Sequence, residues 1–181
     1  MKANYQTAAD VFDGWREDLL TGAPPVLYRI GSGELGRIEI GPKLVTLFGG
    51  APGAGKTAFV MQSVIDGLRL NPKLRALVCN IEMPASVLLD RQAARLSGIS
   101  AESIRYRRIE SKQADRMDKA LGTLEQLAER LAFVRPPFDL ANVAAAADEF
   151  DAGLIVLDYI QRIPPPGSHG DKRGSVDATM S

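Results

Sequence analysis

The stretch that decides the expected fold reads Gly50-Ala51-Pro52-Gly53-Ala54-Gly55-Lys56-Thr57. Its spacing, G-x-x-x-x-G-K-T, is the Walker A pattern of phosphate-binding loops. The apolar run 44–48 precedes it, and apolar residues at helical spacing follow it. We therefore expect a buried strand, a glycine-rich turn and a helix whose N-terminus faces nucleotide phosphates. A turn that binds nothing is the alternative interpretation, and the agreement of these three signals disfavours it.

The residues of this loop have separate expected tasks. Glycines allow backbone N–H groups to turn toward the phosphates. Lys56 is expected to contact the β- and γ-phosphates of ATP and to assist catalysis, and the Thr57 hydroxyl is expected to bind Mg²⁺. The expected nucleotide-binding residues are the eight quoted above together with Ala58.

Upstream, residues 31–36 fit the dinucleotide-binding pattern G-x-G-x-x-G. That pattern requires a helix to follow, but residues 37–40 read as a strand. We therefore expect an ordinary turn between two short strands.

Strand and helix patterns alternate downstream of the loop. Apolar runs predict buried strands over 76–81, 132–134 and 153–158, and helical patterns are expected over 84–96, 112–130 and 140–150. This alternation predicts an α/β fold: a mainly parallel sheet flanked by helices in three layers. A short amphipathic helix over 8–20 carries the only tryptophan, Trp15, which we expect to pack on the main domain or on a neighbouring subunit. We divide the chain into a helix and linker, 1–40, and an ATPase core, 41–181.

Composition excludes several classes of protein. The 22 basic and 22 acidic residues cancel, so a protein that coats nucleic acid by bulk charge is not expected. Cys79 is the only cysteine, which excludes a disulfide framework and a cysteine-based zinc site, and its place in an apolar run predicts a core residue. No stretch is apolar for long enough to span a membrane, and a soluble, cytoplasmic protein is expected.

Two carboxylates are candidates for the chemistry of hydrolysis. Asp158 ends an apolar strand, the Walker B arrangement, and is expected to hold Mg²⁺ opposite Thr57; an aspartate that merely caps the strand is the less favoured alternative. Tyr159 occupies the next position, so no glutamate follows Asp158 directly. Glu82 is the better candidate for activating water, because it follows the second strand at the edge where ligands gather. From position alone, a surface residue capping the next helix is equally plausible for Glu82.

Three segments together carry a family resemblance. They are the Walker A stretch, then Asn80-Ile81-Glu82-Met83, then Leu154-Ile155-Val156-Leu157-Asp158-Tyr159-Ile160-Gln161. In order and spacing they resemble the RecA-like motor domain of bacterial replicative DNA helicases of the DnaB type, and the resemblance covers roughly residues 22–161. Arg91, nine residues after Glu82, is also similar to that family.

The resemblance implies functions for further residues. It makes Glu82 the catalytic base and Gln161 a sensor of the nucleotide. It implies a ring hexamer of the full-length parent that moves on single-stranded DNA, with the loop after Gln161, including Lys172 and Arg173, facing the central channel. A solvated loop is an equally weighted interpretation of that segment. The lead helix near Trp15 would correspond to the segment by which one subunit holds the next.

The sequence departs from the family pattern at its end. No strand follows Asp158 that would lie between the Walker A and Walker B strands, and the segment bearing an arginine finger is missing. We therefore expect two rows of unpaired backbone groups and a truncated product or fragment of a longer protein. The basic cluster 105–108 contains Tyr106; a solvated loop or subunit-contact face is favoured there over a nucleic-acid patch.

The leading functional hypothesis is an ATP-dependent DNA helicase motor with Mg²⁺ as cofactor. One alternative is a RecA-type ATPase that regulates or remodels protein complexes without unwinding DNA. A second is a truncated, inactive module that only binds nucleotide.

Overall fold

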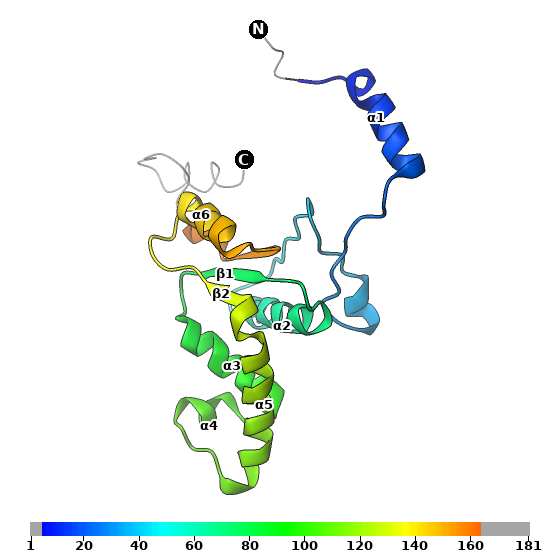
Figure 1. The fold of residues 1–181 in the computed structure, drawn as a ribbon. Coiled ribbons are helices and arrows are strands. Elements are labelled where there is room, and N and C mark those ends of the chain that lie inside the picture. The colour runs from blue at the N-terminus through cyan, green and yellow to red at the C-terminus, as the bar shows by residue number, and fades with distance from the viewer. Residues whose placement is uncertain (1–4, 164–181) are drawn as a thin grey trace.

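A three-stranded parallel sheet forms the centre of the molecule in a computed structural model that describes residues 5–163 (Figure 1). The central strand is β1 (Ala76–Asn80), with β2 (Leu131–Phe133) on one side and β3 (Leu154–Asp158) on the other. Both neighbours run parallel to β1. Each crossover between parallel strands passes through at least one helix, so the predicted α/β class is confirmed.

Helices cover both faces of this sheet because side chains alternate along β1. Ala76 and Val78 join a cluster with α2 (Lys56–Leu70), α3 (Ala85–Ser97) and α5 (Ala114–Leu127). Leu77 and Cys79 join a second cluster, on the opposite face, with α6 (Leu140–Phe150). All five residues of β1 are buried, as a strand covered on both faces requires. The three-layer arrangement expected from the sequence is therefore present.

A glycine and two polar side chains fix the ends of these helices. Gly98 takes a left-handed φ of 67° and ends α3, and the Asp139 carboxylate accepts a hydrogen bond from Asn142 N at 2.8 Å at the start of α6. Arg130 donates to the carbonyl oxygens of Leu68, Asn71 and Leu74 at 3.0–3.2 Å. These carbonyls lie at and just after the end of α2, where backbone acceptors otherwise lack partners.

A helical extension leaves the sheet beyond α3 (Figure 1). It contains α4 (Ala101–Arg105), which the sequence did not predict, and the short 3₁₀ turns η2 (Ser111–Gln113) and η3 (Ala128–Arg130) that flank α5. A small core of its own holds it together, made of Ala93, Ile99, Ile104 and Met117. The basic cluster 105–108 lies here, with Tyr106 55% exposed. The preference for a solvated loop or subunit-contact face over a nucleic-acid patch stays a prediction.

The prediction of a buried strand over 44–48 is wrong. This run contains no strand, and the exposed fractions of Val45 and Leu47 are 98% and 75%. A segment becomes a strand only when its backbone forms hydrogen bonds with a neighbouring strand. Among residues 5–163, β3 pairs only with β1, and no strand lies beside residues 44–48. The ring centroids of Phe48 and Phe59 lie 5.1 Å apart, so the end of the run contacts α2. The run therefore leads into the glycine-rich loop without belonging to the sheet.

The segment between Tyr28 and Ile40 is a turn, as expected, but the strands predicted beside it reduce to one antiparallel bridge between those two residues. Residues 33–37, the start of the expected strand included, form the 3₁₀ helix η1 (Gly33–Arg37) instead. Ile30 is 1% exposed, so its burial fixes this segment against the domain through a side chain rather than a ladder of backbone hydrogen bonds.

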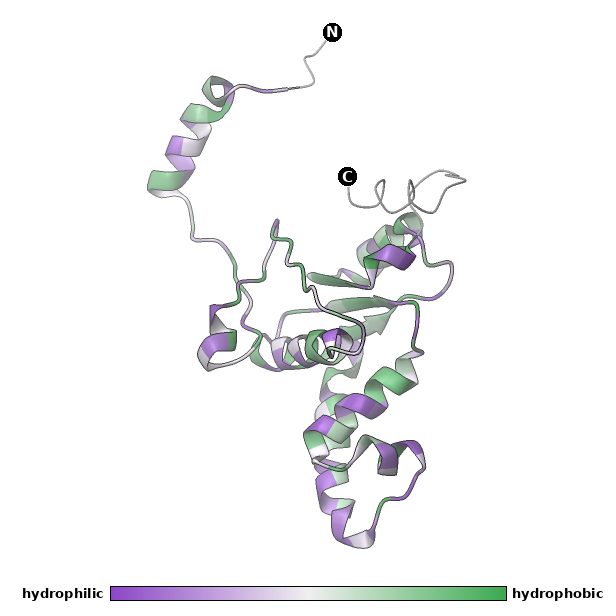
Figure 2. Ribbon diagram, turned by 180° about the vertical axis from the view of Figure 1, so that it is seen from behind, coloured by the Kyte–Doolittle hydropathy of each residue, from purple (hydrophilic) through white to green (hydrophobic). Residues whose placement is uncertain are grey.

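The predicted lead helix is present as α1 (Ala8–Thr21) and stands apart from the rest of the molecule (Figure 1). A capping box between Thr7 and Asp10 begins it, but none of its residues is buried. Trp15 is 55% exposed, and its one aromatic neighbour among residues 5–163 is Phe12, at 5.5 Å between ring centroids. Figure 2 shows apolar residues on this isolated helix. Trp15 therefore does not pack on the main domain.

No helix within residues 5–163 is both long and apolar enough to cross a bilayer.

Candidate nucleotide-binding site

The glycine-rich loop has an open conformation that only glycine adopts easily. Gly53 and Gly55 have φ values of 79° and 87°, in the left-handed region. A Cβ added at either position would meet no atom within 4 Å, so the backbone angle and not crowding requires glycine there. Ala54 N donates to Ala51 O at 3.1 Å and closes a tight turn that contains Gly53. The loop thus has space around it where a ligand can approach the backbone.

Backbone donors are free where α2 begins. The first hydrogen bond of the helix runs from Phe59 N to Gly55 O at 2.9 Å, and within the described residues no acceptor serves the N–H groups of Lys56, Thr57 and Ala58. Free N–H groups and the positive end of the helix dipole suit an anion. Lys56 Nζ donates to Gly50 O at 2.7 Å and to Ala51 O at 3.0 Å, so its ammonium already lies over the loop.

The two candidate carboxylates lie at the carboxyl end of the sheet. Asn80 ends β1 and Asp158 ends β3, and the two are direct partners in the parallel register. Glu82 follows two residues after Asn80, in the turn before α3. The C-terminal end of α2 leads through five residues to the start of β1, so its N-terminus lies at the opposite, carboxyl end of the strands (Figure 1). The loop and both carboxylates are therefore at the same end of the sheet.

Asn80 connects the two carboxylate-bearing segments. Its Nδ2 donates to Asp158 Oδ2 at 2.5 Å, and its Oδ1 accepts from Glu82 N at 3.0 Å and from Met83 N at 2.8 Å. Asn80 and Asp158 are each 9% exposed. Because a buried amide needs partners for both its oxygen and its nitrogen, this arrangement fixes the turn that carries Glu82 relative to Asp158.

Glu82 also receives donors from the segment after β3. Tyr159 Oη donates to Glu82 Oε1 at 2.9 Å, and Arg162 Nη2 is 3.6 Å from the same oxygen. Both side chains belong to the short turn that follows Asp158 and includes η4 (Ile160–Arg162). The carboxylate is thus bound on one oxygen, whereas no hydrogen bond in the described part of the chain uses Oε2.

The free oxygens of Asp158 and Thr57 suit Mg²⁺, which needs few protein ligands. No group of three or more His, Cys, Asp or Glu residues that could hold a metal is present among residues 5–163. Mg²⁺ commonly takes one or two protein oxygens and completes its shell with water and substrate phosphates. Asp158 Oδ1 and the Thr57 hydroxyl, neither of which has a hydrogen-bond partner in the described residues, are oxygens of this kind.

Other predicted site residues are not brought into this arrangement. Gln161 lies in η4, exposed and without a hydrogen bond within the described segment. No hydrogen bond or ion pair in that segment joins the loop 50–57 to Glu82 or Asp158. Lys172 and Arg173 lie outside the described residues.

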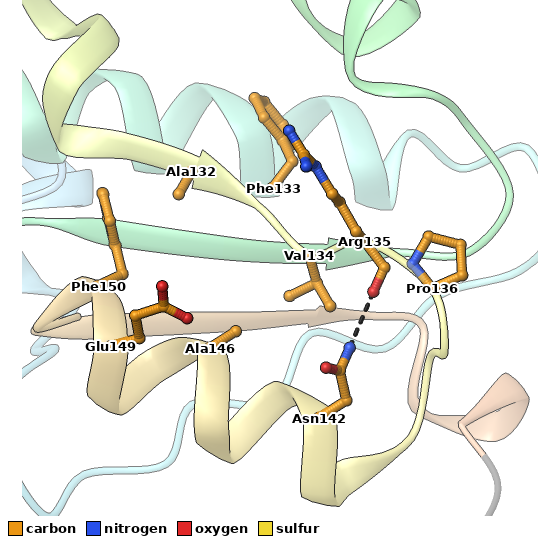
Figure 3. Close-up of a pocket in the computed structure, with 9 residues that line it drawn as sticks. All are labelled: Ala132, Phe133, Val134, Arg135, Pro136, Asn142, Ala146, Glu149 and Phe150. Atoms are coloured by element: carbon orange, nitrogen blue, oxygen red, sulfur yellow. Dashed lines mark hydrogen bonds between the residues drawn. The ribbon is translucent and has the colours of Figure 1, made fainter.

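A hollow of about 380 Å³ lies between β2 and α6, away from these residues (Figure 3). Phe133, Val134 and Pro136 line it from one side, and Ala146 and Phe150 line it from the helix. The hollow includes none of the predicted site residues, because it follows the free edge of β2 and not the carboxyl ends of β1 and β3. It therefore takes no part in the candidate site.

Sequence reasoning missed three residues that organise this site: Asn80, Tyr159 and Arg162. A signal for Asn80 was available, since an amide that ends an otherwise apolar buried strand needs polar partners. No local pattern indicates that Tyr159 or Arg162 reaches Glu82, because the contact spans 77 positions of sequence.

No curated protein matches this chain. A solved structure of a DnaB-like replicative helicase, described together with its interactions with primase, matches with a TM-score of 0.76 at 14% sequence identity. The match covers 98% of this chain and 44% of that chain, so the present chain spans less than half of its length. At this identity the likeness shows a shared, RecA-like fold. The family model of the DnaB-like helicase C terminal domain matches residues 40–180, and the chain therefore belongs to that family.

Proposed function

We propose that this chain is the ATP-binding and ATP-hydrolysing motor domain of a replicative-type DNA helicase that acts on single-stranded DNA. The observation that carries the proposal is that Asn80 joins Asp158, the last residue of β3, to Glu82, in the turn that follows the neighbouring strand β1. The free N–H groups at the start of α2 lie at the same end of the sheet. Membership of the DnaB-like family supports this proposal.

Each residue of the site has a task in this proposal. The loop from Gly50 to Ala58 surrounds the phosphates, and Lys56 exchanges its two backbone carbonyl partners for phosphate oxygens. Thr57 and Asp158 hold Mg²⁺, which neutralises charge on the phosphates when it is bound. Glu82 accepts a proton from the attacking water through Oε2, the oxygen that lacks a protein partner. Gln161 senses the nucleotide.

A homo-oligomeric ring is part of the same proposal, together with the division into a lead segment 1–40 and a core 41–181. The exposed apolar face of α1 supports it, since Phe12, Trp15 and Leu19 are each more than half exposed. Apolar residues in this arrangement are typical of a surface that another protein covers. We propose that a neighbouring copy covers it, and that Lys172 and Arg173 contact DNA.

The rate of ATP hydrolysis, with and without single-stranded DNA, tests the proposal. Lys56→Ala is expected to abolish nucleotide binding, and Glu82→Gln is expected to retain binding but lower hydrolysis by about 10²–10⁴-fold. Lys119→Ala and Glu125→Gln replace exposed residues on α5, far from the site in sequence, and serve as matched controls. Unchanged nucleotide binding in Lys56→Ala contradicts the proposed site. Hydrolysis that DNA does not stimulate favours a regulatory or remodelling ATPase.

A second candidate function is a nucleotide-binding module that does not hydrolyse ATP by itself. The exposed run 44–48 favours it, because the segment leading into the phosphate loop has no strand beside it in the described residues. A loop without this support would bind phosphates but position them poorly for reaction. ATP binding that depends on Lys56, without measurable hydrolysis, would identify this case.

A further inference from the structure

Two side chains that follow β3 converge on one oxygen of Glu82. Tyr159 Oη donates to Glu82 Oε1 at 2.9 Å, and Arg162 Nε donates to Tyr159 Oη at 3.2 Å. Arg162 Nη2 lies 3.6 Å from the same Oε1, and the Arg162 guanidinium carbon lies 5.7 Å from the centre of the Tyr159 ring. The tyrosine hydroxyl accepts from a cation and donates to an anion, so both of its hydrogen bonds are charge-assisted.

Glu82 is restrained from two directions by these contacts. Asn80 holds its backbone N–H and that of Met83, whereas Tyr159 and Arg162 hold its side chain. Without the side-chain contacts, a glutamate with this exposure would sample several rotamers. With Oε1 occupied, Oε2 remains the oxygen available to another molecule.

The hydroxyl is expected to contribute more than the guanidinium. The exposed fractions of the Arg162 and Glu82 side chains are 58% and 41%, so solvent and salt screen their attraction at 3.6 Å. The hydrogen bond from Tyr159 is shorter and directional, and therefore sets the orientation of the carboxylate.

We propose that Tyr159 and Arg162 are positioning residues for ATP hydrolysis, which hold Glu82 with Oε2 directed to accept the proton of water. This inference rests on the proposed function, in which Glu82 is the base. Neither residue is expected to contact nucleotide, so both act through Glu82. If these contacts instead kept Glu82 away from water, removing them would raise the rate of hydrolysis rather than lower it.

Steady-state hydrolysis by the full chain tests the proposal. Tyr159→Phe removes only the hydroxyl and is expected to lower kcat about tenfold without changing KM for ATP. Arg162→Gln is expected to lower kcat about threefold, and Arg162→Lys to recover most of that loss. Tyr106→Phe and Arg37→Gln replace an exposed tyrosine and an exposed arginine elsewhere, and are expected to leave kcat unchanged.

A double-variant comparison separates positioning from a general structural effect. In a Glu82→Gln background, Tyr159→Phe is expected to change the residual rate less than about twofold, because the group it orients has already been replaced. A full tenfold loss in that background overturns the proposal, and so does an unchanged or raised kcat in Tyr159→Phe alone. If Glu82→Gln itself leaves hydrolysis unchanged, or the parent chain hydrolyses no ATP, the proposed function fails and the positioning role fails with it.

Discussion

Asn80 Nδ2 donates a hydrogen bond of 2.5 Å to Asp158 Oδ2. These two residues are also direct partners in the register of β1 and β3. The parallel pairing brings the last residues of both strands side by side, and the amide uses this proximity. Its other end accepts from Glu82 N and Met83 N. One buried side chain therefore connects the proposed metal ligand with the turn that carries the proposed base.

Replacing Asn80 by alanine is expected to destabilise the fold by about 2 kcal/mol, because two partly buried backbone N–H groups and one buried carboxylate oxygen lose their partner. Urea unfolding followed by circular dichroism measures this change. Gln126→Ala is a matched control, since that side chain is exposed on α5 without a hydrogen bond in the described residues. Equal stability of both variants would show that the Asn80 contacts contribute nothing.

Cys79 is expected to resist thiol reagents in the folded chain. Its side chain is 0% exposed, and burial raises the pKa of the thiol above its ordinary value of 9.0. At neutral pH the thiol thus stays protonated and inaccessible, and its reaction with a disulfide reagent should follow the rate of unfolding. Rapid labelling of the native chain, at the rate of a free thiol, would contradict the burial of β1.

The same shift in the pKa of Cys79 makes the stability depend on pH. The folded state holds the Cys79 proton more tightly than the unfolded state, so the contribution is fully present below the unfolded pKa of about 9 and is lost as the pH rises from there through the higher folded pKa. We expect stability to fall above that pH, and the fall to be smaller in Cys79→Ala. Urea midpoints measured from pH 7 to pH 10 for both chains test this expectation.

Leu68 and Leu70, two residues apart on α2, are expected to respond differently to truncation. Leu68 is 0% exposed within the main core cluster, whereas Leu70 is 52% exposed. Leu68→Ala is expected to cost about 3 kcal/mol of unfolding free energy, and Leu70→Ala less than about 1 kcal/mol. Chemical denaturation of the two variants under the same conditions provides the measurement, and similar losses would contradict the assigned face of α2.

Local patterns predicted those parts of the fold in which local and tertiary preferences agree. Apolar residues at helical spacing after the phosphate loop predicted α2, whose buried face carries Met61, Val64 and Leu68, and the helical pattern over 140–150 predicted α6. Of the strands predicted as buried, only β1 is buried throughout, because β2 and β3 are edge strands among residues 5–163 and Ile155 in β3 is 46% exposed. The parallel sheet itself followed from the apolar runs. Glu82 and Asp158 were placed at the carboxyl ends of their strands for the same reason.

Contacts between distant segments could not be predicted in this way. Tyr159 reaches Glu82 only because β1 and β3 are neighbours in register, which no short pattern encodes. The run 44–48 has strand-like composition, but composition does not supply a hydrogen-bonded partner. The helix α4 is five residues long and too short for a periodic pattern.

Trp15 provides a direct measurement of what covers α1. As the only tryptophan, and 55% exposed, it is expected to emit as a solvated indole in dilute solution and to shift to shorter wavelength at concentrations where copies associate. Trp15→Ser is expected to weaken this association in sedimentation velocity without changing the unfolding free energy by more than about 0.5 kcal/mol. A clear loss of stability in the monomer would show that α1 packs on its own domain.

Val45 decides between the strand that composition predicts over 44–48 and the exposed run that the structure shows. Its side chain is 98% exposed, so Val45→Glu is expected to change the unfolding free energy by less than about 0.5 kcal/mol. It is also expected to improve solubility, since a charge interrupts an exposed apolar segment of strand-like composition. Val78→Glu, at a position only 1% exposed in β1, is the comparison and is expected to prevent folding. If Val45→Glu destabilises the chain as Val78→Glu does, a strand or a neighbouring copy buries the run in solution. A destabilisation that depends on protein concentration indicates the neighbouring copy, and one that does not indicates the strand.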